Sequence, residues 1–90
     1  MLANEYVSLI QQIARAFAPL RCVFDGPGSD YVKWVRFIVT DQIDKPLSSR
    51  PIVSHVTDLS HLAGEVHTER ARLIAVGYAL QPWTPPKEWL

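Results

Sequence analysis

This chain lacks an excess of charge of either sign, a second cysteine and a long apolar run. Its nine basic and nine acidic residues give a formal net charge of zero, so the attraction that draws strongly basic domains to nucleic acids or anionic lipids is missing. Cys22 is the only cysteine, which excludes an intramolecular disulfide and fits a reducing cytosol. No apolar run approaches the roughly 20 residues that span a bilayer. We therefore expect a cytoplasmic protein without a membrane partner.

The short length limits how much apolar surface the chain can bury by itself. Ninety residues make one domain with one core, which buries roughly 60–65% of the surface of the unfolded chain. A neutral surface also favours self-association. We therefore expect a domain over residues 1–81, a proline- and tryptophan-rich tail over 82–90, and a homodimer.

The strongest structural signal is the β-branched and aromatic run at residues 31–40, which suits a strand. Side chains alternate between two faces along a strand, and both faces of this run are largely apolar. The pattern predicts a central strand that is covered on both sides, in part by a second subunit. One face carries Tyr31, Lys33, Val35, Phe37 and Val39, and the other carries Val32, Trp34, Arg36, Ile38 and Thr40.

Helical periodicity appears on either side of this strand. Apolar residues recur at helical spacing over residues 4–17, with Asn4 as the expected N-cap. A second apolar stripe starts at Leu59, behind a cap at Thr57 or Asp58. We expect this second helix to end near Val76, because a glycine at position 77 can adopt the conformation that terminates helices.

The remaining segments predict two more strands and their connections. Residues 20–25 read as the first strand, and the glycines and proline at 26–30 predict a hairpin turn into the long strand. Residues 41–51 form a long loop that is either functional or mobile, and 52–57 read as the third strand. The expected fold is α+β in the order α-β-β-β-α, with two helices packed on an antiparallel sheet of three strands, or four.

The residues that carry chemistry do not assemble into a recognisable site. His61, Glu65 and Glu69 share one helical face, but helical metal motifs usually bring further ligands from elsewhere. We interpret these residues, with Arg72, as a solvated stripe. The serines next to His55 and His61 lack a nucleophile elbow. We therefore expect no enzyme activity, no metal and no cofactor.

Nucleic-acid binding is the alternative function. The helix, three-strand, helix order is that of a double-stranded-RNA-binding domain, but the likeness is one of element order only. Such a domain grips phosphates with basic residues near the start of its second helix, where this chain has Asp58 and Glu65. Binding would require four basic residues to converge in space: Lys33, Arg36, Arg70 and Arg72.

A protein-contact role is the favoured function, and it draws on the tail. Trp83 and Trp89 lie on an extended, proline-stiffened segment, and tryptophans carry a large share of interface energies. The tail either covers the core of its own chain or packs on a second subunit. We predict a non-catalytic binding or regulatory protein whose contacts involve Tyr78, Trp83, Trp89 and the loop at 41–51.

Overall fold

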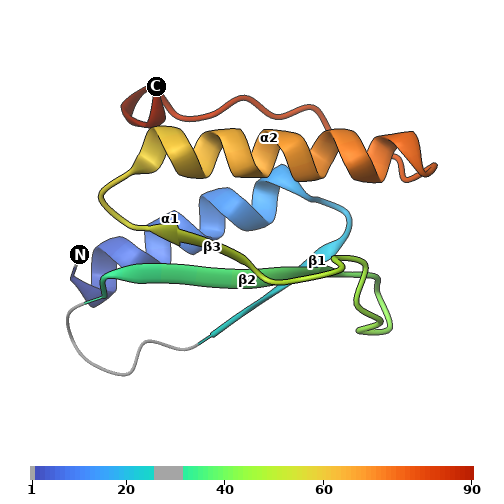
Figure 1. The fold of residues 1–90 in the computed structure, drawn as a ribbon, viewed down its shortest axis with the longest axis horizontal. Helices are drawn as coiled ribbons and strands as arrows, with labels where there is room; N and C mark the ends of the chain where they lie inside the picture. The colour runs from blue at the N-terminus through green and yellow to red at the C-terminus, as the bar shows by residue number, and fades with distance from the viewer. Residues whose placement is uncertain (1, 26–31) are drawn as a thin grey trace.

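The computed structural model describes residues 2–25 and 32–90. In chain order the elements are α1 (Ala3–Ala16), β1 (Arg21–Phe24), β2 (Trp34–Thr40), β3 (Ile52–His55), α2 (Leu59–Ala75) and a short 3-10 helix, η1 (Lys87–Trp89). The strands form one antiparallel sheet in the order β1-β2-β3 (Figure 1). The predicted α+β class, element order and sheet of three strands are confirmed. The predicted turn at 26–30 lies outside the described residues.

The helix boundaries agree with the predicted ones except at the first cap. The expectation that Asn4 caps α1 is wrong, because α1 begins at Ala3 behind Leu2, which makes no side-chain cap bond. α2 starts as predicted, since the carboxylate of Asp58 accepts a hydrogen bond from the His61 N–H at 3.1 Å. It ends next to Gly77, whose φ of 109° is one that L residues rarely adopt.

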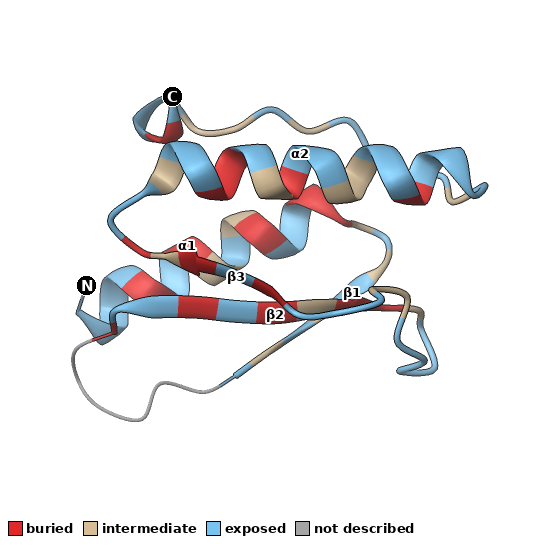
Figure 2. Ribbon diagram, in the orientation of Figure 1, coloured by how far each residue is buried: buried red, intermediate tan, exposed pale blue. Residues whose placement is uncertain are grey.

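The sheet buries one of its faces, which we call the inner face. Val35, Phe37 and Val39 of β2 are buried there, and they pack with residues of α1 and α2 in one core cluster (Figure 2). Trp34 and Arg36, which alternate with them, are exposed on the opposite face, here called the outer face. In Figure 1, α1 passes behind the strands, α2 lies above β3, and no helix stands in front of the sheet.

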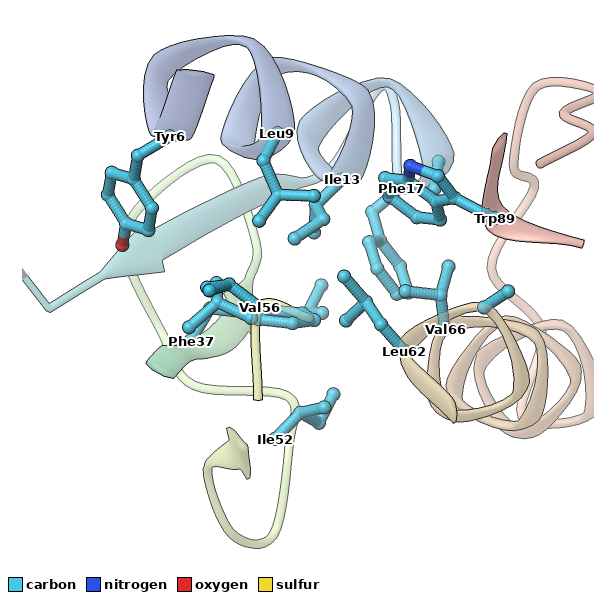
Figure 3. Close-up of a cluster of buried hydrophobic side chains, with 14 of the residues drawn as sticks. Tyr6, Leu9, Ile13, Phe17, Phe37, Ile52, Val56, Leu62, Val66 and Trp89 are labelled. Carbon is cyan, nitrogen blue, oxygen red and sulfur yellow. The ribbon is translucent and has the colours of Figure 1, made fainter. Parts of the chain in front are cut away.

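The described part of a single chain therefore covers only one face of the central strand, and the expected cover of the other face by a second subunit stays a prediction. The strand is central, as predicted, but both helices and the tail contribute to the same core. Trp89 of η1 is only 3% exposed and belongs to the same core cluster (Figure 3). With the helices and the tail used in this way, none of the described elements remains to cover the outer face.

The loop at 41–51 is held by several hydrogen bonds. One carboxylate oxygen of Asp41 accepts from the backbone N–H groups of Ile43 and Lys45, both at 2.9 Å. The Leu47 N–H donates to the Val39 carbonyl at 2.8 Å, and the Arg72 guanidinium donates to the Leu47 carbonyl at 2.6 Å. The loop is therefore tied both to the sheet and to α2.

Candidate functional site

The strand register arranges the outer face in rows that run across the sheet. Val23 of β1 pairs with Ile38 of β2, and Trp34 of β2 pairs with His55 of β3. Between these rows lies Arg36, whose neighbour on β3 is Val53. The outer face thus has one apolar row, one charged row and one aromatic row. Its members include Arg21, Val23, Asp25, Trp34, Arg36, Ile38, Pro51, Val53 and His55.

Trp34 is the largest apolar side chain on the outer face, and 58% of its surface is exposed. Its ring meets the His55 ring edge-on, with centroids 4.9 Å apart. The His55 ring is itself held by Thr57, whose hydroxyl oxygen lies 2.6 Å from the imidazole Nδ1. Trp34 is therefore supported on one side by its neighbour, while more than half of its surface remains exposed to solvent.

A shallow hollow of about 190 Å³ lies beside the charged row. Val23, Ile38 and Pro51 contribute apolar surface to it, and an ion pair between the Arg36 guanidinium and the Asp25 carboxylate, 3.2 Å apart, borders it. A hollow of this kind can receive an apolar side chain from another protein while the ion pair offers hydrogen bonds at the rim.

The exposure of this surface was not predicted from the sequence, although one residue indicates it. Arg36 stands between Trp34 and Ile38 on the same face of β2. A charged side chain in the middle of an apolar strand face is costly to bury without a partner. Its position therefore indicates a face that water reaches in the single chain.

The tail residues that the sequence suggested as partner contacts lie against their own chain. Trp89 is buried, as described above, and the Trp83 ring meets the Trp89 ring at a centroid distance of 6.0 Å. Trp83 and Tyr78 are partly buried against the core. The Trp83 Nε1 atom is buried and has no hydrogen-bond partner among the described residues. A partner-binding role for these three residues stays a prediction.

The four basic residues of the nucleic-acid alternative do not converge. Arg36 lies on the outer face of the sheet and is paired with Asp25, whereas Arg70 and Arg72 belong to α2. The Arg70 guanidinium donates to the Ala16 carbonyl of α1. Arg72 is engaged by the Glu69 carboxylate and by the loop at 41–51. Lys33 is exposed just before β2. Nucleic-acid binding through this set stays a prediction.

A second cavity, of about 380 Å³, opens between α2 and the residues that lead into β3. Its charged lining consists of two arginines and two glutamates, so the formal charges cancel. Arg72 and Glu69 already pair with each other. This balance leaves the cavity without a preference for a charged ligand of one sign.

One serine, one histidine and one glutamate come together in a way the sequence did not indicate. The Ser54 hydroxyl lies 3.1 Å from His61 Nδ1, and His61 Nε2 lies 3.5 Å from a Glu65 carboxylate oxygen. Ser54, His61 and Glu65 are thus arranged in the order of a nucleophile, a base and an acid. However, Ser54 is 1% exposed and lines neither cavity described above. The hydroxyl is therefore enclosed in this arrangement, and its contact with His61 joins β3 to α2.

Residues 2–25 and 32–90 contain neither a cluster of metal ligands nor a helix that could span a membrane. Within these ranges, no three histidine, cysteine, aspartate or glutamate side chains are grouped so that they could hold a metal ion. In the same ranges, none of the helices has the length and apolar character needed to cross a membrane.

No protein-family model, curated protein or solved structure matches this chain.

Proposed function

We propose that this chain is a non-catalytic binding protein that acts through protein–protein contacts, and that the outer face of its sheet is the contact surface. The observation that carries the proposal is the exposure of Trp34, which begins the central strand of the sheet. Val23 and Val53, which are 49% and 43% exposed on the same face, extend the apolar surface to both neighbouring strands.

The composition of the outer face resembles that of the central part of a protein interface. Such centres are enriched in aromatic residues and arginine and are surrounded by apolar contacts that exclude water. Here Trp34 and Arg36 are neighbours on one face of β2, with Val53 opposite Arg36 on β3 and Val23 opposite Ile38 on β1. A tryptophan that becomes buried on binding removes on the order of 100 Å² of apolar surface from water, which contributes about 2–3 kcal/mol to the free energy of association.

A second copy of the chain belongs to this proposal. The whole chain has no net charge, and Asp25 and Arg36 cancel at the centre of the outer face, so two copies meet without long-range repulsion. Sedimentation velocity at about 50 µM tests this part, because a stable interface of standard size forms well below that concentration. We expect a dimer, and a monomer at that concentration would contradict the homodimer.

A photo-crosslinking experiment tests the contact surface itself. Benzoylphenylalanine is placed at position 34 of the full chain, and at position 74 in a matched control. Ile74 of α2 is 51% exposed and lies away from the outer face. After irradiation in cells that produce the chain, we expect defined adducts from position 34 and few from position 74. Adducts that are no more frequent at 34 than at 74 would refute the proposed surface.

A further inference from the structure

β1 is an edge strand whose free side can pair with another strand. The sheet order places β1 next to β2 only, and no other described element pairs with it. The Asp25 N–H donates to the Arg36 carbonyl at 3.1 Å, which sets the alternation of hydrogen bonds along the strand. It follows that the backbone groups of Cys22 and Phe24 point away from β2, towards the open edge.

The side chains of β1 are complementary to those of a second β1 that runs antiparallel to it. When two copies pair about Val23, each Cys22 lies opposite Phe24 of the second copy. The outward N–H and C=O groups of each Cys22 then bond to the C=O and N–H groups of the opposite Phe24. Arg21 then lies opposite Asp25 of the second copy, and this happens twice because the pairing is two-fold symmetric. Both residues are on the outer face, with side chains 60% and 70% exposed.

We propose that two copies of this chain join through their β1 edges, antiparallel about Val23, into one six-stranded sheet. This rests on the homodimer proposed above and specifies how it forms. Cross-strand pairs of opposite charge stabilise a sheet, and like charges directly opposite destabilise it. A second copy suits this edge because its Asp25 and Arg21 would lie opposite the Arg21 and Asp25 of the first copy.

The pairing also enlarges the area of the outer face that is available for contacts. One outer face measures about 14 Å across three strands and about 23 Å along β2, or roughly 330 Å² in projection. Interfaces of standard size bury about 800 Å² on each partner. Edge pairing doubles the continuous face and places the two Val23 side chains next to each other at its centre. It also covers Cys22 and Phe24, which are only partly buried in the single chain.

Charge reversal tests the pairing of Arg21 with Asp25. In Arg21→Asp and in Asp25→Arg, two like-charge pairs replace two opposite-charge pairs, and we expect the dimer dissociation constant to rise by about tenfold or more. In the double variant the pairs are opposite again with their signs exchanged, and the constant should return to within about threefold of the original.

The double variant separates this effect from losses within one chain. Arg21 pairs with Asp44 and Asp25 pairs with Arg36 in the single chain, and the double variant leaves both of these contacts repulsive. Recovery of the dimer in the double variant therefore reports contact between two copies. If the wild type is a dimer and the single variants leave its dissociation constant unchanged, the β1 pairing is wrong while the homodimer stands. A monomeric wild type would overturn both.

Disulfide trapping provides a second test with a matched control. In the Cys22→Ala background, Val23→Cys places one thiol per chain at the centre of the pairing, where opposite Cα atoms are about 4.5 Å apart, a distance that a disulfide spans. Val53→Cys is the control, because Val53 has a similar exposure on the same face but belongs to β3. We expect rapid oxidation to a linked dimer at position 23 and slow oxidation at 53. Equal rates would refute edge pairing and would favour stacking of the two outer faces.

Discussion

Replacing Trp89 with alanine tests whether the tail is part of the folded core. Trp89 is 3% exposed and is a member of the core cluster. It therefore buries on the order of 200 Å², worth about 5 kcal/mol by transfer free energy. Surface already buried in the unfolded chain lowers this by roughly 10–40%. We expect Trp89→Ala to reduce the free energy of unfolding by about 3–4 kcal/mol, within the range for such truncations.

Urea denaturation followed by circular dichroism measures this loss. A chain of this size has a free energy of unfolding of roughly 5–13 kcal/mol, so the midpoint should fall steeply, and the melting temperature should fall by more than about 10 °C. Leu90→Ala is the matched control, since Leu90 is next in sequence but 84% exposed, and it should change stability by less than about 0.5 kcal/mol.

Two outcomes would refute the reasoning about the tail. A loss below about 1 kcal/mol in Trp89→Ala would mean that the tryptophan is not packed in the core in solution. Equal losses in Trp89→Ala and in its neighbour Leu90→Ala would mean that the tail contributes through its backbone and not through the buried ring. Either result would leave the Trp89 ring available for contacts with another protein.

Three further predictions concern the thiol of Cys22, the cap of α2 and nucleic-acid binding. Burial raises the pKa of the Cys22 thiol from 9.0 to about 12. Because the folded chain keeps a proton that the unfolded chain loses above about pH 9, urea midpoints should fall from about pH 9 to pH 11, and fall less in Cys22→Ala. Asp58→Ala removes the cap of α2 and should cost about 1 kcal/mol in urea denaturation, whereas Asp58→Asn should cost much less. Labelled duplex RNA should show no salt-sensitive binding by fluorescence anisotropy, and binding that weakens steeply with salt would favour the nucleic-acid alternative.

The element order was predictable because each signal acts over a short stretch of chain. Helical periodicity, the Asp58 cap and the glycine at position 77 together located α2 within one or two residues. The β-branched run located β2. The first cap was mispredicted because Asn4 lies inside α1, where a helix needs no side-chain cap. Local preferences of this kind do not depend on where the rest of the chain lies.

The candidate site could not be predicted in the same way, because exposure depends on which elements share a core. By sequence Trp34 and Phe37 are equally good strand residues, yet Trp34 is 58% exposed and Phe37 is 1% exposed. By sequence Trp89 is the last tryptophan of a loose tail, yet it is 3% exposed. Trp89, which the sequence placed among the contact residues, is buried, and Trp34, which the sequence placed in a covered strand, is exposed. The proposed contact surface therefore lies on the sheet and not on the tail.

The sequence by itself determined the α+β class, the order of the elements, the central position of β2 and the neutral charge. It also contains the self-complementary pattern of Arg21, Val23 and Asp25. Only the tertiary structure decided that both helices and Trp89 pack into one core, that β1 is an edge and that the outer face is open. The physical reason is that side-chain alternation specifies two faces for each strand, whereas the choice of the face that becomes buried depends on contacts between residues far apart in the chain.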